Sequence, residues 1–134
     1  MAQVTRSVLL AADPETVWAA IGGFQALADW HPAVASASKE MIQGTEHRRL
    51  ALEGGGEILE RFLGADSRSY AYAILEPGPL PGRDYRAILS AAEAGEGRSV
   101  ITWASVFGTP SLEGREAIAQ VYEAGLAALK TRFG

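Results

Sequence analysis

The chain has 134 residues, of which 48% are hydrophobic and 21% charged, and its formal net charge at pH 7 is −4. This length allows one domain with a sizeable core, and no apolar run is long enough to span a bilayer. Because the chain contains no cysteine, disulfides, thiolate catalysis and cysteine-ligated metals are excluded. The start of the chain carries no signal-peptide pattern, so we expect a cytoplasmic protein. Basic residues cluster only at 47–49, which argues against a nucleic-acid partner.

The N-terminal third predicts one strand and two helices. Residues 3–11 are β-branched and aliphatic and predict a strand. The segment "DPETVWAAIGGF" predicts a helix, with Asp13 as N-cap and Pro14 at the first helical position. A second short helix, "FQALADW", follows, and it must end by Trp30 or His31 because proline disfavours the α conformation in the residue before it.

The rest of the chain predicts strands and then one long helix. The separators are turn residues, and the expected strands lie near 34–42, 45–52, 56–64, 67–76, 83–93 and 98–108. Gaps of hairpin length indicate consecutive antiparallel strands. The last stretch, "LEGREAIAQVYEAGLAALKTRF", predicts an amphipathic helix whose apolar stripe is Ile118, Val121, Tyr122, Gly125, Leu126, Leu129 and Phe133. This order of elements predicts an α+β fold in which one bent antiparallel sheet covers its apolar face with the terminal helix.

Five segments carry a resemblance to a known superfamily. They are "DPETVWAAIGGFQALADWHPAV", "GGGEILERFLGAD", "YAYAILEPGPLP", "VITWASVF" and "GLAALK". In this order they resemble the helix-grip proteins of the START-like (SRPBCC) superfamily, which includes polyketide cyclases, plant pathogenesis-related allergens and abscisic-acid receptors. The resemblance covers the whole chain and implies a single helix-grip domain over 1–134, with about seven strands wrapped around the long C-terminal helix. It also implies a cavity between sheet and helix that holds a small hydrophobic ligand, with the short helices and the glycine-rich and proline-rich loops at its rim.

Strand alternation selects candidate ligand-binding side chains. Trp103 and Phe107 share the face that we expect to point inward, and Tyr70 and Tyr72 share one face of their strand. The two tyrosines either present their hydroxyls to a ligand or pack within a half-buried sheet. Tyr85 aligns with ligand-lining positions of similar receptors. The full set of ligand-binding candidates is Trp30, Glu60, Phe62, Tyr70, Tyr72, Tyr85, Trp103, Phe107, Val121 and Gly125.

Glu60 is the sharpest single candidate. It shares a strand face with Ile58 and Phe62, and similar proteins often carry an inward acidic residue here. Burial would raise the pKa of such a carboxyl group, which suits a general acid or base or an anchor for a ligand hydroxyl. Two alternatives are a structural carboxylate held by an arginine or a tyrosine hydroxyl, and a carboxylate on the solvent face.

His31, in "ALADWHPAV", is interpreted first as a structural residue at the end of the helix. A metal site needs three or four ligands, and the chain has two histidines and no cysteine, so no metal is expected. Asp29 is too close in sequence to His31 to complete a serine-type triad. At the C-terminus of a helix we expect His31 to be favoured as a positive imidazolium. The alternative is a proton donor at the rim of the cavity.

The favoured function is therefore binding of a small hydrophobic, lipid-like or polyketide-like molecule, without a cofactor. The alternative is an enzyme of the cyclase or dehydratase kind, in which Glu60 or His31 transfers a proton. A third possibility, implied by the plant receptors, is a module that recruits a protein partner when ligand binds. The loops "LEGGGE" and "LEPGPLPG" either close over the cavity or are ordinary hairpin turns.

Overall fold

A computed structural model of the chain describes residues 1–109 and 111–134. Over these residues the strands are β1 (Ala2–Leu10), β2 (Val34–Ile42), β3 (Thr45–Leu52), β4 (Glu57–Asp66), β5 (Ser69–Glu76), β6 (Arg83–Glu93) and β7 (Ser99–Gly108). The helices are α1 (Pro14–Ile21), the short 3₁₀ helix η1 (Phe24–Ala26), α2 (Leu27–Trp30) and α3 (Leu112–Phe133). The predicted order of elements is confirmed.

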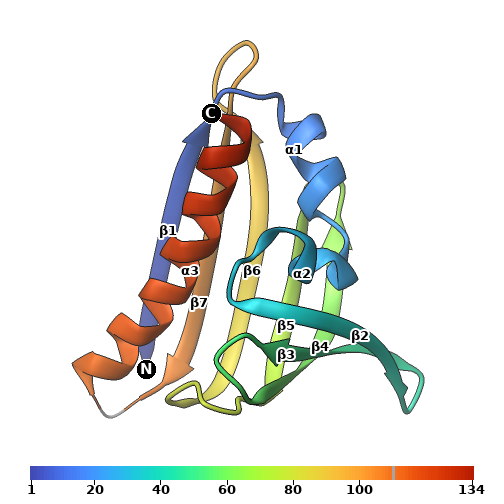
Figure 1. Cartoon of the computed structure of the whole chain (residues 1–134), viewed down its shortest axis with the longest axis vertical. Coiled ribbons are helices and arrows are strands. Elements are labelled where there is room, and N and C mark those ends of the chain that lie inside the picture. Colours follow the sequence, from blue (N-terminus) through green and yellow to red (C-terminus); the bar gives the residue numbers. More distant parts are fainter. Residues whose placement is uncertain (110) are drawn as a thin grey trace.

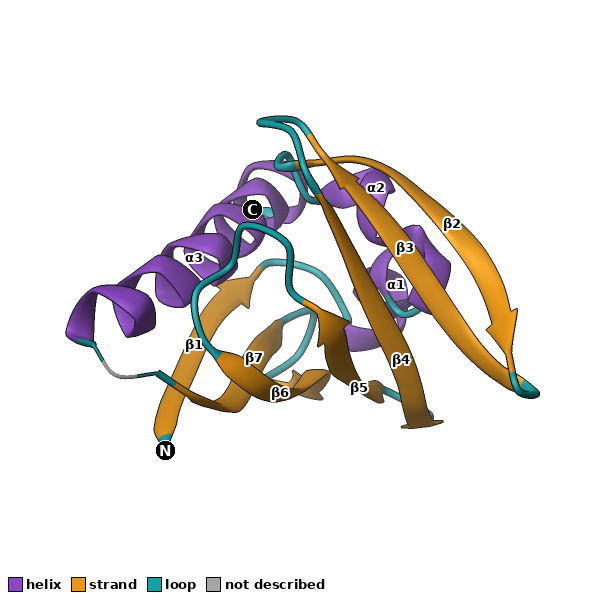
Figure 2. Cartoon of the chain, turned by 90° about the horizontal axis from the view of Figure 1, so that it is seen from below, coloured by secondary structure: helices purple, strands orange, loops and turns teal. Residues whose placement is uncertain are grey.

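The strands form one antiparallel sheet in the order β1-β7-β6-β5-β4-β3-β2. Consecutive strands from β2 to β7 pair as hairpins, and β1 joins the far edge by pairing with β7, with Val4 opposite Ser105. Figure 1 shows α3 running along β1 and β7. Seen from below, the sheet curves from β1 round to β2, with α3 against its concave side (Figure 2). This is the α+β helix-grip architecture that the sequence predicted.

Irregular pairing helps the sheet to bend. The register between β4 and β5 shifts at Leu59–Glu60 and again between Phe62 and Gly64. Such bulges bend a strand and increase its local twist. The first of these shifts lies at Glu60, whose side chain faces the interior.

The helix ends follow the expected local chemistry, with one exception. The helix α1 begins at Pro14, but the side chain of Asp13, although at the N-cap position, makes no capping hydrogen bond. In α3 the Ser111 hydroxyl accepts a hydrogen bond from the Gly114 N–H at 3.1 Å. The helix α2 ends at Trp30, and His31 takes an extended conformation (φ −92°, ψ 120°), as the following proline requires.

The core lies between α3 and the concave face of the sheet. Most of the predicted stripe of α3 is buried, whereas Val121 and Phe133 are half-buried. Opposite the helix, Ile101, Trp103 and Phe107 are almost completely buried, so the predicted inward face of β7 is confirmed. Among the described residues, none of the helices is both long and apolar enough to cross a membrane.

Candidate ligand-binding site

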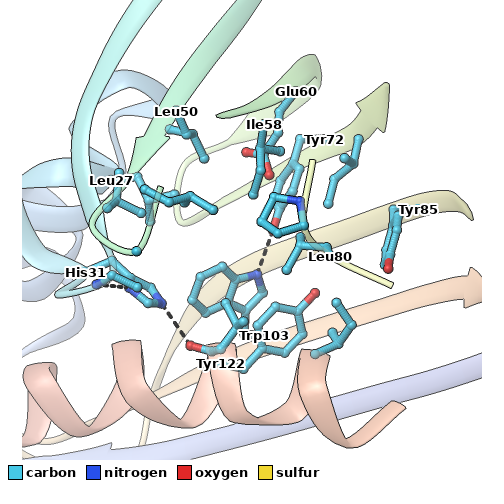
Figure 3. A pocket seen from close by; sticks show the side chains of 18 of the residues that line it. Leu27, His31, Leu50, Ile58, Glu60, Tyr72, Leu80, Tyr85, Trp103 and Tyr122 are labelled. Atoms are coloured by element: carbon cyan, nitrogen blue, oxygen red, sulfur yellow. Dashed lines mark hydrogen bonds between the residues drawn. The ribbon is translucent and has the colours of Figure 1, made fainter. Parts of the chain in front are cut away.

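A cavity of about 320 Å³ lies between the concave face of the sheet, α3 and two loops. Figure 3 shows its wall, with α3 along the bottom of the view and Leu50, Ile58, Glu60 and Tyr72 above it. Most of the wall is apolar, and its polar side chains belong to His31, Glu60, Tyr72, Tyr85, Trp103 and Tyr122. The other lining residues are Leu27, Ala33, Val34, Leu50, Leu52, Gly54, Gly55, Ile58, Ile74, Pro79, Leu80, Ile118 and Val121.

Glu60 forms a buried ion pair with Arg48. The two residues face each other across β3 and β4, and Arg48 Nε donates to Glu60 Oε1 at 2.5 Å. Arg48 is 0% exposed and Glu60 is 4% exposed. The Arg48 guanidinium also donates to the Phe24 carbonyl at 2.6 Å and to the Tyr70 hydroxyl at 3.1 Å, and it lies 4.2 Å from the centre of the Phe24 ring. Arg48 is thus fixed by two strands and by the segment that carries η1.

The two charges of this pair act on each other. Burial raises the pKa of the Glu60 carboxyl group above its ordinary value, and the charge and hydrogen bond of Arg48 act in the opposite direction. Burial disfavours the charged form of Arg48, but Glu60 and the neighbouring phenol groups outweigh it and raise the pKa of the guanidinium. Because arginine does not lose its proton in proteins, the ionised carboxylate is what balances this buried cation.

One oxygen of Glu60 is free. Oε1 takes the bond from Arg48, and no residue that the structure describes donates to Oε2. Arg48 itself does not line the cavity, whereas Glu60 does, and Figure 3 shows the Glu60 carboxylate at the cavity wall. The wall therefore presents a hydrogen-bond acceptor whose counterion lies behind it.

Tyr72, Trp103 and Tyr122 form a connected aromatic group across the cavity. Trp103 Nε1 donates to the Tyr72 hydroxyl at 3.0 Å, as Figure 3 shows. The Trp103 and Tyr122 rings stack with centroids 4.4 Å apart and an angle of 14° between their planes. Burial raises the pKa of both phenols, Tyr72 and Tyr122, so both stay neutral hydroxyls at physiological pH.

Tyr85 contributes its ring to the cavity wall, while its hydroxyl lies beside Gly82. Its ring stacks on Phe107 with centroids 4.8 Å apart. Burial raises the pKa of Tyr85 to about 12. The hydroxyl is buried and has no hydrogen-bond partner among the described residues, so its capacity to donate and accept is unused.

Both ring nitrogens of His31 are occupied by hydrogen bonds to the backbone. Nδ1 accepts from the Ala33 N–H at 3.1 Å, so Nε2 carries the proton and donates to the Val121 carbonyl at 2.8 Å. Burial lowers the pKa of His31, and the bond from Ala33 requires a lone pair that an imidazolium lacks. The expected architectural role fits this geometry, but the expected positive charge is wrong because the ring is buried against α3.

The structure brings part of the predicted ligand-binding set together. Glu60, Tyr72, Tyr85, Trp103 and Val121 line the cavity. The remaining five lie behind the wall and support it. Trp30 packs on Trp103, Phe62 on Phe24, and Phe107 on Tyr85, while Tyr70 accepts a hydrogen bond from Arg48 and Gly125 lies under His31.

The sequence reasoning missed the counterion and several wall residues. Arg48 and Leu50 lie two residues apart on β3 and therefore share its inward face, and both are buried. A charged residue at an inward position two places from a core leucine was the signal that could have found it. Tyr122 was predicted for the apolar stripe of α3 but not for the cavity, where the structure places it.

Both loops that the sequence singled out contribute to the cavity. Gly54 and Gly55 come from the turn between β3 and β4, and Pro79 and Leu80 come from the loop between β5 and β6. Gly78 of the second loop packs against Glu57 at the end of the first loop. The approach is so close that a Cβ on Gly78 would lie 2.2 Å from the Glu57 carbonyl oxygen. In the part of the chain that the structure describes, no three His, Asp or Glu side chains come together as a metal-ligand set.

A curved antiparallel sheet that wraps a long C-terminal helix and leaves a lined cavity defines the helix-grip class. The chain belongs to one family of this class. The family model described as "Polyketide cyclase / dehydrase and lipid transport" matches residues 1–134, which confirms the resemblance drawn from the sequence.

Solved structures agree with this assignment. The chain is 32% identical to the protein XoxI from Bacillus cereus, with a TM-score of 0.89 over 99% of this chain and 96% of that one. An uncharacterized protein from Bacillus thuringiensis is 30% identical, with a TM-score of 0.89 over 98% of each chain. The Zhui aromatase/cyclase from Streptomyces sp. R1128 shares the fold, with 22% identity and a TM-score of 0.76 over 98% of this chain and 92% of that one. No curated protein matches the chain.

Proposed function

We propose that this protein binds a small hydrophobic molecule in the cavity between the sheet and α3. The observation that carries the proposal is a cavity of about 320 Å³ with a mostly apolar wall and a few converging polar groups. Ligand sites of small-molecule binding proteins have this composition, and their volumes start at roughly 300 Å³. Burial of the ligand's apolar surface supplies the affinity, and the polar groups set its orientation.

A reaction at Glu60 is the second candidate, and one observation favours it. The Glu60 carboxylate, whose pKa burial raises and which has one free oxygen at the wall, suits a general base. His31 suits this role poorly, because both of its nitrogens already bond to the backbone. An enzyme would lose turnover in Glu60→Gln while it still binds its substrate, whereas a carrier would change only in affinity.

The first test asks whether the cavity binds anything. Native mass spectrometry of the freshly purified protein, compared with its denatured mass, should show a bound molecule that denaturation releases. Titration with Nile red, an uncharged hydrophobic dye, should give saturable fluorescence enhancement that the released molecule competes away.

A matched pair of variants locates the binding. Val121→Trp places a large side chain in the cavity wall, whereas Ala124→Trp places it on the exposed face of the same helix. We expect Val121→Trp to lose Nile red binding and Ala124→Trp to keep it. If the wild-type protein carries no adduct and shows no saturable Nile red signal, the proposed function is contradicted.

A further inference from the structure

We propose that the Arg48–Glu60 pair makes this cavity selective for uncharged hydrophobic molecules that carry a hydroxyl group, and makes it reject carboxylates. This inference rests on the proposed function, because it specifies the chemical class of the ligand that the cavity holds. Two features of the wall lead to it: the charge balance and the free oxygen of Glu60.

The charge balance of the pair is already complete without a ligand. Arg48 is 0% exposed and its only ion-pair partner among the described residues is Glu60. A protonated Glu60 would leave the guanidinium as an uncompensated buried cation, which is strongly unfavourable. The pair is therefore one cation and one anion, and a ligand that brings a further charge would enter the cavity without a counterion.

The ligand meets only the negative member of the pair. Glu60 lines the cavity, while Arg48 lies behind it among the Phe24, Tyr70 and Tyr72 rings. No lysine or arginine belongs to the described residues that line the cavity. A carboxylate ligand would thus face a like charge in a desolvated site, with no cation to bind it.

The free Oε2 of Glu60 defines what the ligand must offer. An ionised carboxylate accepts hydrogen bonds and donates none, so a matching ligand places an N–H or O–H group there. A ligand hydroxyl supplies this proton without adding charge. Hydrogen bonds to an ionised acceptor are about twice as strong as those between neutral groups, so the presence of the donor should be visible in the affinity.

Tyr85 adds ring surface rather than a polar contact to the wall. Its hydroxyl is fully buried and lies beside Gly82, so it does not face the ligand. The matching molecule is apolar, uncharged and hydroxylated where it meets Glu60.

The test compares three probes that share one ring system. At neutral pH 2-naphthol is an uncharged donor, 2-methoxynaphthalene lacks the donor, and 2-naphthoate is an anion. Isothermal titration calorimetry with the wild-type protein should show 2-naphthol binding about tenfold more tightly than 2-methoxynaphthalene, as expected for a hydrogen bond to a charged acceptor. Binding of 2-naphthoate should be the weakest of the three.

A double variant identifies the pair as the cause. Arg48→Met with Glu60→Leu replaces both charges together and so leaves neither one buried alone. It should bind 2-naphthol and 2-methoxynaphthalene with similar affinity. The matched control is Arg49→Met with Glu40→Leu. It removes a partly exposed ion pair whose arginine is the residue after Arg48 on β3. This control should keep the wild-type preference.

The outcomes separate the two proposals. If 2-naphthoate or 2-methoxynaphthalene binds as tightly as 2-naphthol, the inference is overturned while ligand binding stands. If none of the three probes binds and Nile red does not bind either, the proposed function fails and the inference fails with it. The probe comparison needs only the wild-type protein, so it decides the question even if the double variant does not fold.

Discussion

His31 and Gly125 are distant in the sequence and meet where α2 ends against the middle of α3. A Cβ atom on Gly125 would lie 2.6 Å from His31 Cδ2 and 3.1 Å from Trp103 Cζ3. The missing side chain lets the imidazole approach the helix and donate to the Val121 carbonyl at 2.8 Å. A glycine inside a helix costs about 1 kcal/mol relative to alanine. At position 125 the absence of a side chain is required for the contact between His31 and α3.

Gly125→Ala should therefore destabilise the protein, although alanine is the better helix former. Overpacking of a filled site costs about 1–3 kcal/mol, and displacement of His31 adds the loss of its hydrogen bond to Val121. We expect a net loss of about 1–2 kcal/mol in the free energy of unfolding, measured by urea denaturation. Ala124→Gly, at the exposed neighbouring position, gives the effect of helix propensity alone. A Gly125→Ala protein more stable than the wild type would show that the contact with His31 is unimportant.

The buried His31 should make stability depend on pH. Burial lowers the pKa of His31 below its ordinary value of 6.5, and the unfolded chain regains that value. Between pH 6.5 and the lower folded-state pKa the unfolded chain binds a proton that the folded chain does not. The stability from His31 is therefore full above pH 6.5 and is lost as the pH falls from there through the folded-state pKa. The slope reaches at most about 1.4 kcal/mol per pH unit for one proton.

Urea denaturation from about pH 8 to about pH 5 measures this dependence. His31→Asn keeps an acceptor for the Ala33 N–H but has no titrating ring, so the His31 contribution to the slope should disappear. The same substitution at His47, the other histidine of the chain, leaves His31 in place and should keep that contribution. A wild-type protein and a His31→Asn variant with the same pH profile would contradict the assignment.

Most of the fold could be predicted from the sequence because its signals are local. Turn residues mark the ends of the strands, and β2, β3, β6 and α3 have the predicted bounds. Alternation on β7 places Trp103 and Phe107 inside, as observed. The strands β4 and β5 begin one or two residues later than predicted, since the local pattern does not define where pairing starts.

The site could be predicted only in part because its decisive contacts join distant residues. The inward direction of Glu60 agrees with the favoured prediction, but its partner Arg48 belongs to another strand and depends on the register between β3 and β4. His31 is neutral because α3 covers it, which a local rule about helix ends does not include. Tyr70 points inward as expected, but its hydroxyl bonds to Arg48 and not to the cavity. The direction of a side chain alone therefore did not predict which residues line the cavity.

The indole of Trp103 should depend on Tyr72 for its hydrogen bond. Tyr72→Phe removes the acceptor of the Trp103 Nε1–H and leaves a buried donor unpaired, which costs about 1–3 kcal/mol. Tyr85→Phe is the matched control, because Tyr85 is equally buried but its hydroxyl has no partner among the described residues. We expect urea denaturation to show a clear loss of stability for Tyr72→Phe and a smaller change for Tyr85→Phe. The opposite ranking would contradict the assigned bond.

Arg48→Met should be the most destabilising of these substitutions at neutral pH. It leaves the Glu60 carboxylate buried without its cation, and breaking a buried pair in this way costs about 3–5 kcal/mol. Burial then raises the pKa of Glu60 with no opposing charge from Arg48. A carboxyl group with a raised pKa in the folded state favours folding below its ordinary value of 4.5, and this contribution is lost as the pH rises through the folded-state pKa.

The loss caused by Arg48→Met should therefore be smaller in mildly acidic buffer than at neutral pH, because protonation neutralises Glu60. Urea denaturation at the two pH values measures this difference. Arg49→Met is the control on the same strand, since its pairs with Glu40, Glu57 and Glu76 are partly exposed and exposed pairs contribute about 0–1 kcal/mol. Equal losses for the Arg48 and Arg49 variants would show that the buried cation does not hold Glu60. A loss for Arg48→Met that does not change with pH would show that Glu60 does not take up a proton when its partner is gone.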